Sequence, residues 1–526
     1  MIDRTSKLKQ LIGQMVVVRA SGYLFDRQIR YPVWEPPNST LRRWLETLNL
    51  GGVILLGGSA AEIALRTRQL QDWSPHPLLI AADIEEGVGQ RFAGATWFPP
   101  PMALGEIAKK DVNKAKEYAF RMGAITAREA LSIGINWVLA PIVDVNNNPE
   151  NPVINIRAFG ETPEIVSELA RSFILGARSY PVLTTAKHFP GHGDTGSDSH
   201  LDLPVLEHDL DRLETLELPP FQAAIETGVD SVMSGHLLIP AWDREHPATL
   251  SRKILTERLR EKMGFDGIIV TDALIMGGVT KVASPAEVAV MAVEAGADIL
   301  LMPPDPEVAI EAVYKAVTSG RISEERILES IARIRRAKEK LGPPENSIEL
   351  LFDLGEPRAI ATVEAIVKDS CKIGGNLPLE TGNGRNLIIV DDLLNCDFLD
   401  RSSPAVTIPR QAGYEVQTVD RTTLKYCPDD DRSSLLQLFL RGNPFRGSAG
   451  LTEENKRIYR ALLETGRVRG MIIYGSPYVF AWFRSLIDDD LPIVFTYSQE
   501  AAAQKIACEK LFGLSSPSGD IDREFV

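Results

Sequence analysis

Short apolar runs alternate with amphipathic segments through roughly the first 340 residues, and this alternation constrains the fold more than any other feature. Strands and helices in alternation indicate parallel strands joined by crossover helices, and eight such units predict a (β/α)8 barrel over residues 1–342. The apolar runs that we interpret as buried strands are Met15–Arg19, Gly52–Leu56, Leu78–Asp83, Ile135–Val143, Val182–Lys187, Ser231–His236, Gly267–Asp272 and Asp298–Met302. The segments with helical spacing include Val112–Ser132, Pro163–Ser179, Leu210–Thr227, Ser251–Met263 and Pro285–Ala295.

The pattern changes after residue 342. We expect a mostly irregular linker over residues 343–384, with one stretch of helical periodicity at Pro357–Val367. A smaller C-terminal α/β domain of the three-layer sandwich type is predicted over residues 385–526. Its middle, Tyr426–Gly450, is rich in Asp, Ser, Arg and Gly and is predicted to be a long loop. The expected strands are Asn386–Val390, Gly470–Tyr474 and Leu491–Phe495, followed by a helix at Gln499–Phe512.

Composition excludes several classes of partner. A net charge of −14 argues against nucleic acid or an anionic membrane surface as the main partner, because both attract basic proteins. We recognise neither a signal peptide at the N-terminus nor an apolar run of the ~20 residues that a membrane span needs. The four cysteines have no CxxC spacing, which is typical of reduced thiols. We therefore expect a cytoplasmic protein.

Titratable residues follow five successive predicted strands at the same end. They are Asp83, Asp144, the pair Lys187 and His188, His236 and Asp272. Catalytic groups in (β/α)8 barrels gather where strands run into the following loops. The sequence therefore predicts an active site at this end of the barrel.

The densest group lies in the loop after the fifth strand, AKHFPGHGDTGSDSHLDLP at 186–204, which holds three of the seven histidines. One interpretation is a solvated loop with incidental charges. The other is a catalytic loop, because Asp198 and His200 are two residues apart and share a face of an extended chain. A carboxylate in that position fixes the imidazole tautomer and makes His200 an oriented proton carrier.

Asp272 follows a continuous apolar strand, so its carboxylate lies beside a desolvating wall at the barrel mouth. Position alone fits a helix N-cap as well as a nucleophile. A carboxylate nucleophile opposite a proton donor is what retaining glycoside hydrolysis requires. Here the donor would be the imidazolium of His200 instead of a second carboxylic acid.

A metal site is a competing interpretation of the same loop, because His188 and His192 have HxxxH spacing. Pro190 and Gly191 interrupt the helix on which such ligands usually lie, which disfavours it. We expect neither a metal nor an organic cofactor.

At these residues the chain resembles glycoside hydrolase family 3, in its branch of bacterial β-N-acetylhexosaminidases. The family's Lys-His-Phe-Pro-Gly-His-Gly stretch, with Asp-Ser-His after it, stands at Lys187–Gly193 and Asp198–His200. Its nucleophile motif matches Gly264–Gly267 and Thr271–Leu274. Its D-x-E-x-G-x-x-Q-R pattern matches Asp83–Arg91, and an arginine before a Phe-Gly turn matches Arg157. Weaker similarity extends to the second domain, at Leu511–Gly513 and Ser516–Gly519.

The resemblance implies a role for each matching residue. Asp272 is expected to be the nucleophile and His200 the acid/base, with Asp198 as its partner. The residues expected to hold the hydroxyl and acetamido groups of the sugar are Asp83, Arg91, Arg157, Lys187 and His188, and His236 lies at a family-like position after the sixth strand. From the residues alone, Arg91 and Arg157 could also be surface ion-pair residues and His188 a packed histidine. His192 is expected to shape the loop, and Asp144 to cap it.

Two departures from the family pattern bear on function. Ile84 stands where the family more often has a polar residue, and Glu86 where it has glycine, which alters the shape of that subsite. The second domain has no convincing catalytic carboxylate, as in the hexosaminidase branch, in which the loop histidine supplies the acid/base.

The resemblance thus implies a retaining exo-β-N-acetylhexosaminidase that acts on N-acetylglucosaminides and muropeptide fragments in peptidoglycan recycling. The alternatives are a phosphorylase of the same family and, in another class, a non-catalytic sugar-binding protein. The sequence predicts no oligomeric state.

Overall fold

The computed structural model describes residues 4–196, 199, 201–342, 348–393, 396, 398–420, 422–429, 431–441 and 451–514. The chain divides into two compact units, the first ending at Thr362 and the second beginning at Val363. The boundary falls inside helix α13 (Pro357–Ser370), within the stretch for which the sequence predicts a linker.

The first unit is built on an eight-stranded parallel sheet in the order β7-β6-β5-β4-β3-β2-β1-β8. A parallel bridge between Val270 and Ile299 brings the two ends of this sheet together. The strands are β1 (Val16–Ser21), β2 (Gly52–Leu56), β3 (Leu79–Ala82), β4 (Trp137–Val138), β5 (Leu183–Phe189), β6 (Ser231–Ser234), β7 (Ile268–Thr271) and β8 (Leu300–Leu301). All eight expected strands are present, and the predicted (β/α)8 barrel is confirmed.

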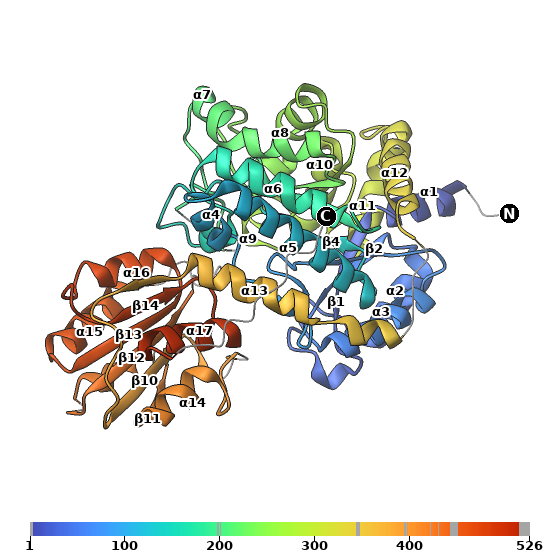
Figure 1. Ribbon diagram of the computed structural model, residues 1–526. Coiled ribbons are helices and arrows are strands. Elements are labelled where there is room, and N and C mark those ends of the chain that lie inside the picture. Colours follow the sequence, from blue (N-terminus) through green and yellow to red (C-terminus); the bar gives the residue numbers. More distant parts are fainter. Residues whose placement is uncertain are drawn as a thin grey trace. The chain divides into compact units, whose positions relative to one another are not determined.

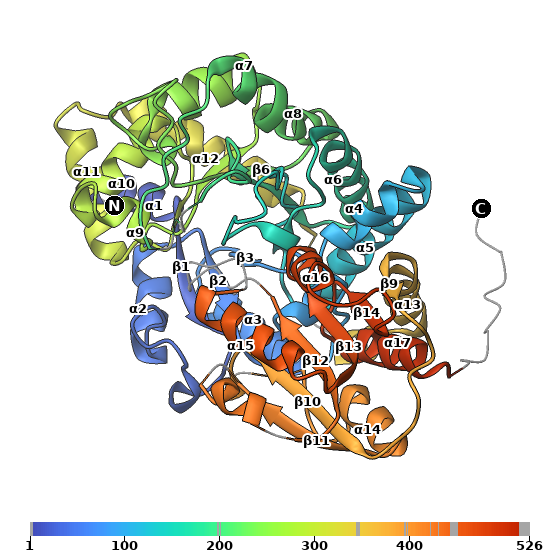
Figure 2. The ribbon, with the colours of Figure 1, turned by 90° about the vertical axis from the view of Figure 1, so that its left-hand side faces the viewer.

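Helices surround the strands of this unit, as Figure 2 shows. They are α1 (Arg4–Gly13), α2 (Asn38–Leu48), α3 (Ala60–Trp73), α4 (Met102–Ala108), α5 (Val112–Ser132), α6 (Pro163–Ala177), α7 (Leu210–Arg212), α8 (Leu218–Thr227), α9 (Gly277–Thr280), α10 (Pro285–Ala295), α11 (Pro306–Thr318) and α12 (Glu324–Glu339). Side-chain caps begin several of them: Ser59, Asp111 and Ser284 each accept a hydrogen bond from a backbone N–H in the first turn. Two predicted helices contain π-helical turns, η4 (Leu213–Glu217) and η6 (Lys253–Lys262).

Strand β4 is much shorter than the predicted run Ile135–Val143. Pro141 has no N–H to donate to a neighbouring strand, so the ladder ends before it. Trp137 of β4 fills the barrel interior, where its indole N–H lies 2.9 Å from Thr185 Oγ1 and 3.0 Å from Ser231 Oγ.

The second unit is a six-stranded sheet in the order β11-β10-β12-β13-β14-β9. All pairs are parallel except the edge strand β9, which is antiparallel to β14. The strands are β9 (Lys372–Gly374), β10 (Gly384–Val390), β11 (Tyr414–Val419), β12 (Ser434–Leu440), β13 (Val468–Gly475) and β14 (Ile493–Thr496). Figure 1 shows helices on both faces, and the predicted three-layer α/β arrangement is confirmed. These helices are α14 (Pro404–Gln411) and α17 (Ala501–Phe512) on one face, and α15 (Glu453–Glu464) and α16 (Pro477–Arg484) on the other.

The prediction of a long loop over Tyr426–Gly450 was wrong for residues 434–440, and residues 442–450 of that range lie outside the described residues. The segment contains β12, a central strand whose seven residues are all buried between β10 and β13. The run SLLQLFL is apolar enough for a buried strand, but polar residues flank it and Gln437 interrupts it. Gln437 is satisfied inside the sheet, because its amide donates to Asn386 Oδ1 and to the carbonyl of Ala405.

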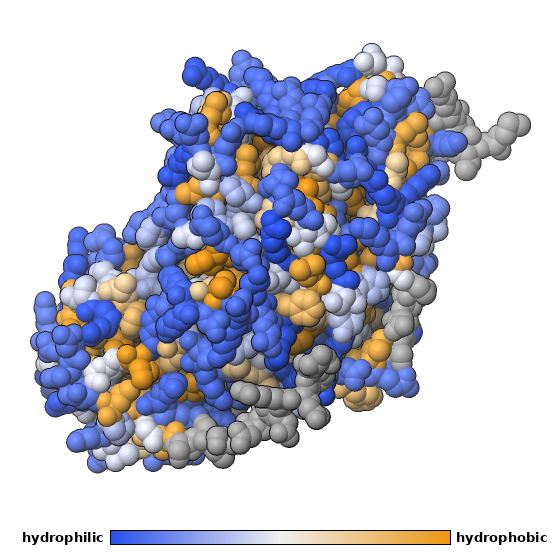
Figure 3. All heavy atoms as spheres, turned by 45° about the horizontal axis from the view of Figure 1, so that its top comes forward, coloured by the Kyte–Doolittle hydropathy of each residue, from blue (hydrophilic) through white to orange (hydrophobic). Residues whose placement is uncertain are grey.

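Among the residues that the structure describes, no helix is both long and apolar enough to cross a membrane. On the face shown in Figure 3, hydrophilic residues predominate and hydrophobic residues form small patches between them.

Candidate active site

The strand registers bring the predicted site residues to one end of the barrel. Asp83 follows β3, Lys187 and His188 lie near the end of β5, and Asp272 follows β7. Because the strands are parallel, their carboxyl ends form a single rim. Paired residues of neighbouring strands project to the same face. By this rule Asp272, two residues beyond Val270, lies on the inner face with Lys187, since Lys187 pairs with Met233 and Met233 with Val270.

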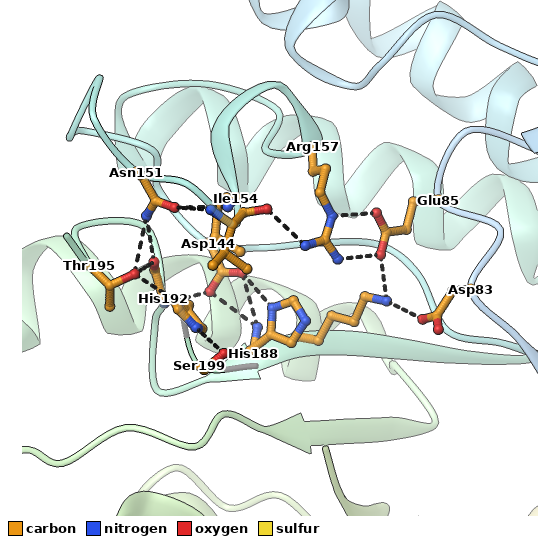
Figure 4. Close-up of polar contacts among 12 residues, drawn as sticks. Asp83, Glu85, Asp144, Asn151, Ile154, Arg157, His188, His192, Thr195 and Ser199 are labelled. Atoms are coloured by element: carbon orange, nitrogen blue, oxygen red, sulfur yellow. Dashed lines mark hydrogen bonds and ion pairs between the residues drawn. The ribbon is translucent and has the colours of Figure 1, made fainter. Parts of the chain in front are cut away.

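Four charged side chains interlock at this rim (Figure 4). Lys187 Nζ lies 2.7 Å from Asp83 Oδ1 and 2.6 Å from Glu85 Oε1. Arg157 donates to both oxygens of Glu85, from Nε at 2.9 Å and from Nη2 at 2.8 Å. Burial alone would raise the pKa of Glu85, but Arg157 and Lys187 outweigh it and hold that pKa well below its usual range. Glu85 is therefore a permanent anion that fixes both cations.

Exposure separates the members of this cluster. The side chains of Lys187 and Glu85 are 1% and 2% exposed, whereas that of Asp83 is 36% exposed. The buried Lys187 therefore fixes one oxygen of the Asp83 carboxylate, while part of the Asp83 side chain faces solvent. Such a group can accept hydrogen bonds from the hydroxyls of a bound ligand without reorganising.

A second cluster organises the start of the loop after β5. Asp144 is fully buried and accepts hydrogen bonds from the backbone N–H groups of His188 and His192, while its Oδ2 lies 2.8 Å from His188 Nδ1. Asp144 therefore fixes the orientation of the His188 ring and leaves Nε2 as its other edge. The expectation of a loop cap describes part of this role.

His192 is buried, and its two ring nitrogens contact Thr195 Oγ1 at 2.7 Å and Ser199 Oγ at 2.8 Å. Burial, helped by His188, lowers the pKa of His192 to about 4, so the ring is neutral at physiological pH. Asn151 also donates to the carbonyl of His192. His192 thus holds the loop in shape, as expected.

His236 is fully buried and contacts the residue that follows Asp272. Its Nδ1 lies 2.8 Å from Thr249 Oγ1, and its Nε2 lies 3.0 Å from the carbonyl of Ala273. Asp272 itself is half-buried. Its backbone N–H donates to the backbone carbonyl of Ser234 at 3.1 Å, and its Oδ1 accepts a hydrogen bond from the N–H of Ala273. His236 therefore supports the turn that carries Asp272 by its contact with the backbone carbonyl of Ala273.

Asp198 and His200, the predicted acid/base pair, lie outside the described residues. Residues on either side of position 200 contact the segment that follows Asp272. The carbonyl of Ser199 accepts from the N–H of Gly278 at 3.2 Å, and Lys281 Nζ lies 3.0 Å from the carbonyl of Leu201.

Arg91 lies further out than the other predicted binding residues. It is exposed, and its Nε donates to the backbone carbonyl of Asp83 at 3.0 Å. Sequence reasoning did not assign the central role of Glu85, although its place in the D-x-E motif was a signal. Glu86, the departure from the family pattern, is fully buried and accepts a hydrogen bond from the indole of Trp97 at 3.0 Å.

No group of three His, Cys, Asp or Glu side chains in the described part of the chain is arranged to hold a metal ion.

Comparison with known families identifies the chain. Residues 7–337 match the glycosyl hydrolase family 3 N-terminal domain, and residues 378–513 match the bacterial glycosyl hydrolase family 3 C-terminal domain. The protein belongs to glycoside hydrolase family 3. The family resemblance seen in the sequence is thereby confirmed.

Named relatives indicate the branch. The chain is 33% identical over 404 residues to beta-hexosaminidase A of Pseudoalteromonas piscicida, covering 70% of this chain and 66% of that protein. It is 30% identical over 369 residues to beta-N-acetylglucosaminidase/beta-glucosidase of Cellulomonas fimi, covering 66% of this chain and 64% of that protein. The chain thus spans slightly less than two thirds of either relative.

A solved structure resembles both units. The family 3 β-N-acetylglucosaminidase of Paenibacillus sp. has a TM-score of 0.81 and 29% identity, with 97% of each chain covered.

Proposed function

We propose that this family 3 protein is a retaining exo-β-N-acetylhexosaminidase that hydrolyses terminal β-linked N-acetylglucosamine. The observation that carries the proposal is the arrangement of the barrel rim. A solvent-facing Asp83, paired with the buried Lys187 that Glu85 also holds, shares that rim with Asp272 at the end of β7. The names of the relatives, which act on hexosaminides, support the same substrate class.

In the proposed first step, a carboxylate oxygen of Asp272 attacks the anomeric carbon and the bond to the leaving oxygen breaks. The His200 imidazolium, whose charge Asp198 stabilises, gives its proton to that oxygen and becomes a neutral imidazole. In the second step the neutral imidazole takes a proton from water, which displaces Asp272 and restores the β configuration. The contacts of Ser199 and Leu201 with Gly278 and Lys281 support this pairing, because they bring the two loops together.

We assign substrate binding to the charges around Asp83. Its carboxylate would accept hydrogen bonds from two sugar hydroxyls, while Lys187, His188 and Arg157 donate to neighbouring oxygens. Arg91 would reach the ring from the outer edge of the site. His236 acts as a positioning residue, since it contacts the backbone at Ala273.

The test compares two aryl glycosides that differ only at C2, the β-N-acetylglucosaminide and the β-glucoside. We expect kcat/KM to favour the N-acetylglucosaminide by at least about 100-fold, which corresponds to about 2.7 kcal/mol of transition-state discrimination. Equal rates on both, or preference for the glucoside, would contradict the proposal. Repeating the assay with inorganic phosphate distinguishes the phosphorylase. In a phosphorylase, phosphate would attack in place of water in the second step, and the product would be a sugar 1-phosphate instead of the free sugar.

We further propose the cytoplasm as the site of action and cell-wall fragments as the natural substrates. The structure joins none of the four described cysteines in a disulfide, and Cys427 and Cys508 are buried, which is compatible with a reducing compartment. Turnover of purified muropeptides, followed by mass spectrometry of released N-acetylglucosamine, checks the substrate. Cleavage of simple aryl glycosides without any cleavage of muropeptides would contradict this role.

A further inference from the structure

The loop between β1 and α2, residues 22–37, is firmly anchored. The N–H of Leu24 donates to Glu62 Oε1 at 3.1 Å, and the side-chain amide of Asn38 donates to the carbonyl of Leu24 at 2.8 Å. Gly57, with φ +78°, leaves room for this loop, because a Cβ there would lie 2.9 Å from the ring of Tyr23. The side chains that this loop exposes are therefore presented in fixed positions.

Arg19 of β1 faces the same barrel mouth as the predicted active site. It pairs with Ile54 of β2, and Ile54 pairs with Ala81 of β3, two residues before Asp83. Residues in register project to the same face of a sheet, and alternate residues along a strand do so too. Arg19 thus lies on the inner face with Asp83, two strands away and one pair of residues deeper.

A buried carboxylate and two aromatic rings hold the Arg19 guanidinium. Glu35, 2% exposed, accepts from Nε at 3.1 Å and from Nη2 at 2.9 Å. The guanidinium carbon lies 5.0 Å from the ring centre of Tyr31 and 5.2 Å from that of Trp34, and these two rings stack at 5.8 Å. Among the described residues, Nη1 of Arg19 has no hydrogen-bond acceptor. A fixed cation thus retains donor capacity beside aromatic rings.

We propose that Arg19, Tyr31 and Trp34 form the subsite for the leaving-group saccharide of the substrate. The inference rests on the proposed function, since an exo-acting glycosidase that takes its sugar at Asp83 must accommodate the rest of the substrate at the same rim. It adds a binding determinant on β1 and its following loop, which none of the sequence motifs includes.

The chemistry of these side chains matches a sugar ring. Tyr31 is 44% exposed and Trp34 is half-buried, so part of their aromatic surface can pack against the C–H face of a pyranose. The Nη1 edge of Arg19 can donate to a hydroxyl or acetamido oxygen of the same ring. Glu35 fixes the fork before the ligand arrives, which reduces the entropy lost on binding.

Two substrates with the same N-acetylglucosamine test the subsite. N,N′-diacetylchitobiose has a full sugar as leaving group, whereas β-N-acetylglucosaminyl azide has a leaving group of three atoms. We expect Tyr31→Ala and Arg19→Lys to lower kcat/KM for the disaccharide about tenfold and to change it for the azide by less than about twofold. Phe25→Ala is the matched control, because Phe25 is a 60% exposed ring of the same loop with no contact to Arg19.

The Phe25→Ala protein should process both substrates within about twofold of the unsubstituted protein. Equal losses on both substrates, or an unchanged rate on the disaccharide, would overturn the subsite while leaving the proposed function intact. If the unsubstituted protein cleaves neither substrate, the proposed function fails, and the subsite fails with it.

Discussion

Both ends of the barrel concentrate buried carboxylates, but the two ends satisfy them differently. At the amino end, Asp298 accepts hydrogen bonds from the N–H of Ile269 and from Ser330, and pairs with Arg260 at 2.7 Å. Arg326 and Arg333 lie 3.4 and 3.2 Å from the same carboxylate.

Asp230 plays a similar part nearby. It accepts from the N–H of Thr184 at the start of β5 and pairs with Lys340 of the segment after α12 at 2.6 Å. Each of these carboxylates thus joins the beginning of a strand to helix α12 or to the residue directly after it.

At the carboxyl end, the carboxylates of Asp83 and Asp272 remain partly exposed to solvent. Glu85 is enclosed by Lys187 and Arg157, but the carboxylate of Asp83 remains open on one side, and Asp272 is half-buried. We infer that the amino end stabilises the fold and that the carboxyl end can bind a ligand. A carboxylate whose oxygens are all hydrogen-bonded links strands to helices, whereas a carboxylate with a solvent-exposed side can still accept hydrogen bonds.

The largest expected effect is on turnover at the carboxyl end. Asp272→Ala should lower kcat on an aryl N-acetylglucosaminide by about 10⁴-fold or more, because no other carboxylate replaces the nucleophile. The free energy of unfolding should change by less than about 1 kcal/mol, since the side chain is partly solvated. Near-normal activity would remove Asp272 from the mechanism.

The second effect concerns the proton donor. His200→Ala should lower kcat/KM by about 10²–10⁴-fold on substrates with poor leaving groups, and much less on activated aryl glycosides that need no protonation. A series of aryl glycosides of graded leaving-group pKa measures this as a steeper dependence of rate on pKa. Equal losses across the series would argue against an acid role for His200.

The third effect is on stability at the amino end. Asp298→Ala leaves Arg260 and Arg326 without the buried carboxylate that they share, and leaves Arg333 only a 3.7 Å contact with the exposed Asp266, so it should lower the free energy of unfolding by about 3–5 kcal/mol. Asp266→Ala is the control, because Asp266 is 70% exposed and pairs at the surface with Arg336 at 2.8 Å and with Arg333 at 3.7 Å, so its loss should cost less than about 1 kcal/mol. Chemical denaturation measures both. Equal small changes would contradict the stabilising role of this end.

The fourth effect depends on pH and concerns Glu217, which packs against the loop after β5. The side chain of Glu217 is 4% exposed, and a Cβ added at Gly191 of this loop would lie 2.9 Å from the Cβ of Glu217. Arg212 Nη2 lies 3.5 Å from Glu217 Oε1. Burial, only partly offset by Arg212, raises the pKa of Glu217 to about 7.

Between pH 4.5 and about 7 the folded protein therefore holds a proton that the unfolded chain releases, so this group's contribution to stability falls as pH rises. Glu217→Gln removes the titration. The stability of this variant relative to the unsubstituted protein should increase by up to about 3 kcal/mol from pH 4.5 to 7 and then level off. Denaturation curves at several pH values measure the difference, and a difference independent of pH would contradict the assignment.

The smallest expected effect is none. Incubation with EDTA should leave kcat unchanged at the carboxyl end, because the proposed mechanism moves only protons and one sugar. Strong inhibition that zinc or another divalent ion reverses would instead favour the metal interpretation of His188 and His192.

The sequence predicted the barrel well because its strands have a simple signature. Buried parallel strands are continuous apolar runs, and a titratable residue directly after such a run marks the rim, as at Asp83 and Asp272. Strand β12 was missed because Gln437 and the polar flanks of the strand resemble a loop. The burial of Gln437 depends on the side chain of Asn386 in β10 and the backbone carbonyl of Ala405 in α14, which lie far away in sequence.

Local pattern also could not distinguish the roles of neighbouring charges. Glu85 and Asp83 belong to one motif, yet only tertiary contacts with Lys187 and Arg157 make the first a buried anchor and leave the second facing solvent. The sequence did not predict the proposed subsite of Arg19, Tyr31 and Trp34 for the same reason, since Glu35, the partner of Arg19, is 16 residues away across a loop.

The most direct test of the carboxyl end as the catalytic end is to trap the glycosyl-enzyme. A fluorinated N-acetylglucosaminyl substrate that forms the intermediate quickly and hydrolyses slowly is incubated with the protein, which is then digested and analysed by mass spectrometry. The proposed mechanism predicts one added sugar on the peptide that contains Asp272, and none in Asp272→Ala. A sugar on another residue, or turnover of the substrate with inversion at the anomeric carbon, would contradict it.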